Sequence, residues 1–158
     1  MKQFSMARRA TLLLSVALLT ACASGVKLDD VDSKAGTDFS SQPWNDPKSP
    51  LFKRSVYFDF DSYTVKSEYQ ATLQAHANYL KANKDRKIKI EGNTDERGTT
   101  EYNLALGQRR SEAVRKSLSL LGVPDSQMEA VSFGKEKPKA QGSNEAAWQE
   151  NRRADIAY

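Results

Sequence analysis

The charged and amide residues of the stretch EGNTDERGTTEYNLALGQRR, residues 91–110, could bind a charged ligand because they join a strand-like run to an amphipathic helix. Four apolar residues fall on one face of the helix predicted for residues 102–121: Leu106, Ala113, Val114 and Leu121. Arg110 lies in the middle of that apolar arc, and Asn103 lies on the same face. A buried arginine is costly unless it is paired and hydrogen-bonded, and it cannot shed its proton. We therefore predict that Arg110 meets an anion.

The carboxylates that could meet Arg110 lie in two places. Asp95 and Glu96 stand in the loop before the helix, and Asp59 and Asp61 follow the first strand-like run. If the first two strands are neighbours and parallel, their carboxyl ends share one rim with the helix N-terminus, where ligands bind in α/β sheets. The residues alone leave two interpretations open: a buried Arg110–Asp95 ion pair that only holds the loop, or a site for an anionic ligand.

The elements that must position these residues follow from hydrophobic periodicity. Alternating apolar residues predict strands at 56–61, 86–92, 128–134 and 152–158. Helical spacing predicts helices at 66–82, 102–121 and 144–151, the second of them capped by Thr99 or Thr100. The order βαβαβαβ predicts an α+β fold, a two-layer sandwich with the helices on one face of a four-stranded mixed sheet.

The first 22 residues have the pattern of a bacterial export signal. A positive segment precedes an apolar stretch at residues 10–19, which is too short to span a bilayer. The stretch ends in Leu-Thr-Ala-Cys, which resembles the lipobox of bacterial lipoproteins. Cys22 is the chain's one cysteine, so it has no disulfide partner within the chain. We predict a signal peptide at 1–21, a lipidated Cys22 and, because Ala23 rather than aspartate follows, an outer-membrane address.

Composition separates a tether from a folded domain. Residues 22–53 are rich in Asp, Ser, Gly, Lys and Pro, with apolar residues spaced singly, and we predict a disordered tether there. The folded domain is predicted at 54–158. The chain has 24 basic and 20 acidic residues, but residues 1–22 hold three of the bases and no acid. The remainder is close to neutral and shows no basic stripe, so nucleic-acid binding is not expected.

One motif indicates the family to which the domain is similar. Residues 94–110 match the pattern T-D-x-x-G-x-x-x-x-N-x-x-L-x-x-x-R of the OmpA-like peptidoglycan-binding domain, which the chain resembles over residues 55–158. The runs VYFDFDS, SFGKEKP and ENRRADI agree with the same family. The six matched positions are Thr94, Asp95, Gly98, Asn103, Leu106 and Arg110. One position departs from the pattern, because the family usually has histidine where this chain has Asn93.

The resemblance implies a ligand and a role for each site residue. The family binds the diaminopimelate of the peptidoglycan stem peptide, whose side chain ends in an ammonium beside a carboxylate. By that resemblance Asp95 would take the ammonium, and Arg110 would hold the carboxylate in a bidentate pair. Asn103 would bond the ligand's polar atoms. The remaining site residues by the same resemblance are Thr94 in the motif and Phe60, Asp61 and Arg97 at the rim.

The resemblance also implies location and partners. The chain is expected at the periplasmic face of the outer membrane, anchored by lipid, as part of the Tol system that serves envelope integrity and cell division. The periplasmic propeller protein TolB is an expected partner, and neither a cofactor nor a metal is expected. His76, Trp44 and Trp148 are interpreted as packing residues.

The residues leave two other function classes open. A periplasmic hydrolase could use paired carboxylates such as Asp59 and Asp95. However, the chain has no exposed-nucleophile motif and its one histidine lies away from the motif. A metal site built from Asp59, Asp61 and Asp95 would have few oxygen ligands. A purely protein-binding module that docks a partner such as TolB is the second alternative.

Overall fold

Residues 42–158 are the part of the chain that the computed structural model describes. The predicted signal peptide, Cys22 and the tether up to residue 41 lie outside this part. Within residues 42–158, no helix has the length and apolar character needed to cross a bilayer.

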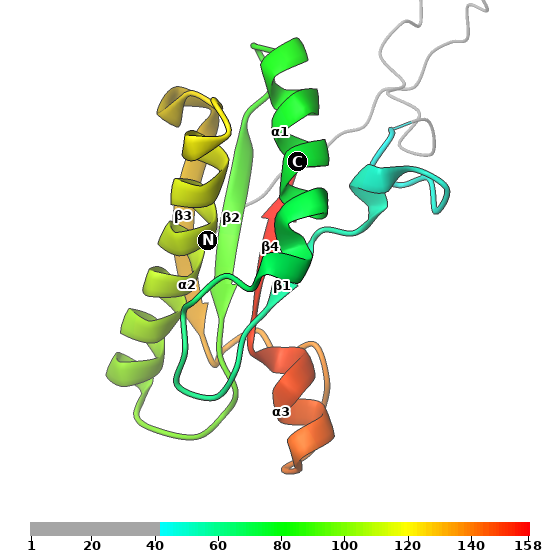
Figure 1. Cartoon of the computed structure of the whole chain (residues 1–158). Coiled ribbons are helices and arrows are strands. Elements are labelled where there is room, and N and C mark those ends of the chain that lie inside the picture. The colour runs from blue at the N-terminus through cyan, green and yellow to red at the C-terminus, as the bar shows by residue number, and fades with distance from the viewer. Residues whose placement is uncertain (1–41) are drawn as a thin grey trace, which may run out of the picture. The chain divides into compact units, whose positions relative to one another are not determined.

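Four strands form one mixed sheet, in the order β1-β4-β2-β3 (Figure 1). Their bounds are Ser55–Tyr57 for β1, Ile88–Asn93 for β2, Met128–Gly134 for β3 and Arg153–Ala157 for β4. Strand β4 pairs antiparallel with both β1 and β2, and β2 pairs parallel with β3. The predicted fold class is confirmed.

The first two strands, which the sequence left open as possible neighbours, are separated by β4. Alternation of apolar residues indicates which face of a strand is buried and carries no information on its neighbour. Strands β1 and β2 still run in the same direction, since each is antiparallel to β4. The carboxyl ends of β1, β2 and β3 therefore meet the start of β4 at one rim of the sheet.

Two long helices cover one face of the sheet, and a short third helix lies at the end where β4 begins (Figure 1). Helix α1 spans Gln70–Ala82, α2 spans Thr100–Leu120 and α3 spans Glu145–Asn151. The Thr99 hydroxyl accepts a hydrogen bond from the Tyr102 amide at 3.2 Å and so caps α2. Helix α1 begins later than residue 66 because residues 67–69 form a separate 3-10 turn.

Two glycines let α2 lie directly on β2. A Cβ built on Gly92 would lie 1.8 Å from the carbonyl oxygen of Gly107, and one built on Gly107 would lie 2.3 Å from the Ser132 hydroxyl. Backbone therefore packs against backbone at this crossing. The contact holds the first half of α2, with Asn103 and Arg110 on either side of Gly107, over the carboxyl end of β2.

The segment 42–53 packs on the domain, so the predicted domain start at residue 54 is too late. Trp44 is 7 % exposed, and its ring stacks on Tyr158 with centroids 4.2 Å apart. It also meets the edge of Tyr79 at 5.8 Å, and Leu51 is buried as well. The sequence predicts a tether here because Trp44 and Leu51 stand alone among polar residues, and their apolar neighbours come from distant parts of the chain.

His76 joins the same region from α1 and is a packing residue, as predicted. Its Nε2 lies 2.9 Å from the Lys53 carbonyl oxygen, and its Nδ1 lies 2.6 Å from the Tyr158 hydroxyl. Because a carbonyl only accepts, Nε2 carries the proton and Nδ1 accepts from the hydroxyl. Burial lowers the pKa of His76, which keeps the ring neutral.

Trp44→Ala should lower the free energy of unfolding of the mature chain by on the order of 3 kcal/mol, because it removes a buried aromatic ring and leaves a cavity. Phe52→Ala is the matched control, since Phe52 belongs to the same segment and is 45 % exposed. That change should cost less than about 1 kcal/mol. Urea unfolding followed by circular dichroism measures both. Equal and small losses of unfolding free energy in the two variants would show that residues 42–53 do not stabilise the domain and would support the predicted tether.

Candidate functional site

A pocket of about 200 Å³, here called the cup, opens at the rim where β1, β2 and β3 end. It is lined by Phe60, Asp61, Thr94, Asp95, Arg97, Gly98, Tyr102, Asn103, Leu106 and Arg110. All seven domain residues predicted for the site are therefore brought together: Phe60, Asp61, Thr94, Asp95, Arg97, Asn103 and Arg110. Their contacts with a ligand remain a prediction.

Arg110 faces inward, as the helical pattern predicts, but its partners are backbone carbonyls. Its side chain donates from Nε to Ser62 O at 2.8 Å, from Nη1 to Asn93 O at 2.9 Å and from Nη2 to Asp59 O at 3.1 Å. The residue is 0 % exposed, and burial lowers the pKa of its guanidinium to about 10. Asp95 acts on Arg110 through its charge, without an ion-pair contact. Neither interpretation of Arg110 drawn from the residues includes these carbonyls.

Asp95 pairs with two other arginines. Its Oδ1 accepts from the Arg97 amide at 3.1 Å and from Arg97 Nε at 3.2 Å. Its Oδ2 accepts from Arg97 Nη2 at 2.7 Å and from Arg152 Nη1 at 3.4 Å. Burial raises the pKa of the Asp95 carboxyl, but the hydrogen bonds and charge of Arg97, with a smaller part from Arg152, outweigh it and hold the pKa below its ordinary value. The carboxylate is therefore charged at neutral pH.

Arg97 lies between two aromatic rings. Its guanidinium carbon is 4.2 Å from the centroid of Phe60 and 4.0 Å from that of Trp148. Trp148 in turn donates from its indole nitrogen to Glu96 at 3.0 Å. The Arg97 side chain is 33 % exposed, whereas the Asp95 side chain that it covers is 6 % exposed. Cation–π contacts and the ion pair thus hold Arg97 across the carboxylate.

The loop between β2 and α2 is held by its own polar groups. The Thr94 amide donates to Gly134 O at 2.8 Å, which ties the loop to the end of β3. Asn103 donates from Nδ2 to Arg97 O at 2.9 Å, and Gly98 turns the chain with a φ of +98°. Asn93 donates to Glu91 O, but its Oδ1 is buried and finds no hydrogen-bond partner within residues 42–158.

The carboxylates considered for a hydrolase or a metal do not converge. Asp59 is exposed, forms an ion pair with Lys66 at 2.7 Å and does not line the cup. Asp61 accepts a hydrogen bond from the Tyr102 hydroxyl. Across residues 42–158, no group of three or more His, Cys, Asp or Glu side chains is placed to hold a metal ion.

Sequence reasoning missed Arg152, Tyr102 and Trp148. Arg152 is 2 % exposed and donates to Phe58 O, Glu145 and Gln149 as well as to Asp95. It reaches both loops because β4, which it precedes, lies between β1 and β2. Arg152 belongs to the run ENRRADI, but the alternation of apolar residues in so short a run does not indicate a charged partner in a distant loop. Tyr102 and Trp148 were interpreted as a helix residue and a packing residue.

Comparisons with known proteins agree on one family. Residues 57–152 match the model of the OmpA family. A peptidoglycan-associated lipoprotein of Pasteurella multocida is 48 % identical over 144 residues, which are 91 % of this chain and 92 % of the relative. Its counterpart in Haemophilus influenzae is 46 % identical with the same coverage.

Solved structures show the same likeness. The crystal structure of the peptidoglycan-associated lipoprotein from Burkholderia pseudomallei has a TM-score of 0.72 and 70 % identity, covering 74 % of this chain and 99 % of that one. The C-terminal domain of Helicobacter pylori MotB shares the fold, with a TM-score of 0.59 at 22 % identity over 65 % of this chain and 81 % of that one.

Arg110→Ala should lower the free energy of unfolding by about 3–5 kcal/mol, because one buried and two partly buried hydrogen bonds to backbone carbonyls are lost and a large buried side chain is removed. Arg109→Ala removes the same charge from the next, exposed position and should change stability by about 0.5 kcal/mol or less. Thermal and urea unfolding of both variants, without ligand, makes the comparison. Similar stability of the two variants would show that the three carbonyl contacts contribute little.

Proposed function

The chain belongs to the OmpA family and, within it, to the peptidoglycan-associated lipoproteins, and from that membership we propose that it binds peptidoglycan non-covalently and ties the outer membrane to the cell wall. The observation that carries this proposal is the cup. It places one buried carboxylate, Asp95, beside the partly exposed cation of Arg97 and the buried cation of Arg110. Opposite charges side by side suit the zwitterionic end of diaminopimelate.

The ligand's ammonium binds Asp95 by exchange with a donor already there. A carboxylate offers about four lone-pair sites, and Asp95 accepts four hydrogen bonds. Three of the donors belong to Arg97, whose side chain is partly exposed, and the fourth belongs to the buried Arg152. The ammonium therefore takes the place of the Arg97 side chain, and Arg152 stays.

The ligand's carboxylate then meets two arginines of different kinds. Arg97, once displaced from Asp95, is the exposed cation at the mouth of the cup. Arg110 forms three hydrogen bonds and has five N–H groups, so two N–H groups remain beyond those bonds. Asn103 lines the cup beside Arg110 and keeps the amide contact that holds the loop. The charges of the zwitterion are thus matched on both ends.

A second role is proposed on the same surface. Phe60 and Tyr102 line the cup and are 62 % and 47 % exposed. Exposed aromatic residues around a pocket favour protein docking, and by family resemblance the partner is TolB of the Tol system. Pull-down with isolated cell walls separates the two roles. Muramidase digestion of the wall should release the chain if it binds peptidoglycan directly, whereas release that requires protease would favour a protein partner.

Asp95→Asn should weaken binding of a soluble diaminopimelate-containing stem peptide by on the order of 2–5 kcal/mol, because the ammonium loses a partly desolvated counter-charge. Lysine-type stem peptide lacks the second carboxylate, so it should bind the unaltered chain poorly. Asp59→Asn is the matched control, because Asp59 is exposed and lies outside the cup lining. Isothermal titration calorimetry measures the binding of both peptides to the unaltered chain and to each variant. An unaltered chain that binds both peptides equally would rule out diaminopimelate recognition.

Cys22→Ser should release the protein from the outer-membrane fraction, because we propose that acyl chains on Cys22 provide the anchor at roughly 0.8 kcal/mol per buried CH₂. Fractionation of envelopes after a salt wash, followed by immunoblotting, measures the distribution. Sedimentation of the variant with the outer membrane would place the anchor elsewhere in the chain.

A further inference from the structure

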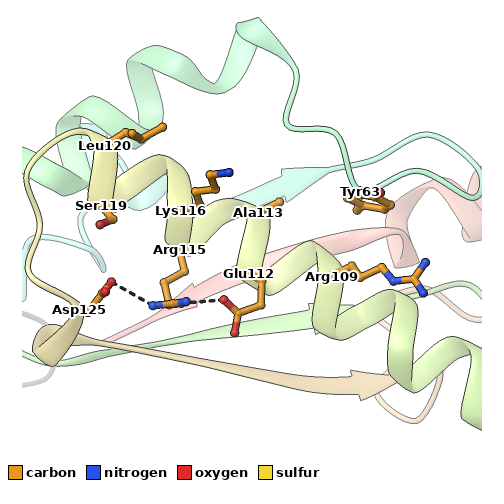
Figure 2. Close-up of a pocket in the computed structure, with 9 residues that line it drawn as sticks. All are labelled: Tyr63, Arg109, Glu112, Ala113, Arg115, Lys116, Ser119, Leu120 and Asp125. Atoms are coloured by element: carbon orange, nitrogen blue, oxygen red, sulfur yellow. Dashed lines mark hydrogen bonds and ion pairs between the residues drawn. The ribbon is translucent and has the colours of Figure 1, made fainter.

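A groove of about 620 Å³, here called the α2 groove, runs along α2 beside the loop that follows β1 (Figure 2). It is lined by Tyr63, Arg109, Glu112, Ala113, Arg115, Lys116, Ser119, Leu120 and Asp125. Tyr63 and Arg109 lie at one end and Leu120 lies at the other (Figure 2). It is separate from the cup, with which it shares no lining residue.

The charges of the α2 groove leave a positive excess. Arg115 binds Glu112 at 2.8 Å and Asp125 at 3.0 Å, so both carboxylates of the groove pair with the same cation (Figure 2). The three cations and two carboxylates that line the groove leave one net positive charge. Arg109 and Lys116 form no ion pair with any carboxylate of residues 42–158. Two cations without a carboxylate in contact, in a groove with one net positive charge, suit a ligand that carries a carboxylate on an otherwise weakly charged chain.

The α2 groove continues the cup along the helix. Tyr102, Arg109 and Lys116 follow one another at seven-residue intervals, which places them on nearly the same side of α2, about 10 Å apart. Tyr102 lines the cup, whereas Arg109 and Lys116 line the groove. The loop after β1 also extends from the cup to the α2 groove, because Asp61 lines the cup and Tyr63 lines the groove. A ligand that leaves the cup along α2 meets Arg109 next.

The opposite side of the cup is less favourable for an anionic chain. Glu96 in the β2–α2 loop is exposed, and Glu145 lies in the first turn of α3. The cation on that side, Lys135, donates to the Gly98 carbonyl oxygen at 3.0 Å. Glu145 is paired with Arg152 at 2.6 Å, but the exposed Glu96 repels a carboxylate there, whereas the α2 groove has one net positive charge.

We propose that the α2 groove is a second subsite for peptidoglycan, in which Arg109 binds the free α-carboxylate of the stem-peptide glutamate that precedes diaminopimelate. The inference rests on the proposed function, because diaminopimelate in the cup sets the starting point. An extended residue spans about 3.3–3.6 Å, which is shorter than the distance of about 10 Å along α2 between Tyr102 and Arg109. The Arg109 side chain covers the remainder, because helix side chains point toward the N-terminus of their helix and so toward the cup. Tyr63, whose ring lies 5.9 Å from the Arg109 guanidinium, supplies an apolar wall.

A double-mutant cycle between protein and ligand tests the contact. The probes are a soluble muramyl tripeptide with the free glutamate α-carboxylate, the same tripeptide with that carboxylate amidated, and free diaminopimelate. Amidation should weaken binding to the unaltered chain roughly three- to fivefold, which is the range for a partly exposed ion pair. Arg109→Gln should weaken binding of the acidic tripeptide by the same factor, and amidation should then have no further effect. Free diaminopimelate should bind both proteins equally.

Lys89→Gln is the matched control for net charge. Lys89 alternates with the core residues Ile88 and Ile90 and so lies on the sheet face opposite the helices. Its replacement should leave all three affinities unchanged. The inference is overturned if amidation does not affect the unaltered chain, or if Arg109→Gln weakens free diaminopimelate as much as the tripeptide. Failure of the unaltered chain to bind any probe would overturn the proposed function, and this inference with it.

Discussion

The rim of this domain depends on one buried guanidinium. Arg110 projects from α2 and donates to three carbonyl oxygens, those of Asp59 and Ser62 in the loop after β1 and that of Asn93 at the end of β2. Strands β1 and β2 are not neighbours, so no ladder hydrogen bond joins their ends. A planar cation with several donors can bridge such ends, whereas an ammonium on a flexible stem would not match all three carbonyls. Helix α2 and both loops are thus held as one unit.

Charge balance then decides what the cup accepts. Asp95 accepts hydrogen bonds from the partly exposed Arg97 and from the buried Arg152. Under the proposed function, Arg97 moves when the ligand binds and Arg152 stays in place. Under the proposed function, an amine without a carboxylate could bind Asp95 only by displacing the Arg97 guanidinium, which would then lack an ion-pair partner. A ligand that brings its own carboxylate restores that partner. Under this proposal, a preference for a zwitterion would arise from the exchange of ion pairs, in addition to the shape of the pocket.

The sequence predicted much of the fold because its signals are local. The Thr99 cap, the bounds of β3 and the inward position of Arg110 all follow from spacing within a few residues. Strand order does not follow from local spacing, because strand pairing depends on the whole chain. The partners of Arg110 do not follow from it either, because they are backbone carbonyls, which every residue carries. The same holds for Trp44, which looked like part of a polar tether. Its stacking partner, Tyr158, is the last residue of the chain.

The site and the N-terminal segment lie at opposite ends of β4. Arg152, just before β4, contacts Asp95 in the cup, and Tyr158, just after it, stacks on Trp44. Under the proposed function, the wall holds the first end and the chain leading to the membrane leaves from the second. A pull between them acts along β4, which has strands paired on both sides. Ladder hydrogen bonds of antiparallel strands lie perpendicular to that direction, so they resist the pull together rather than one at a time. The central position of β4 therefore joins ligand recognition to the mechanical connection that a membrane-to-wall link requires.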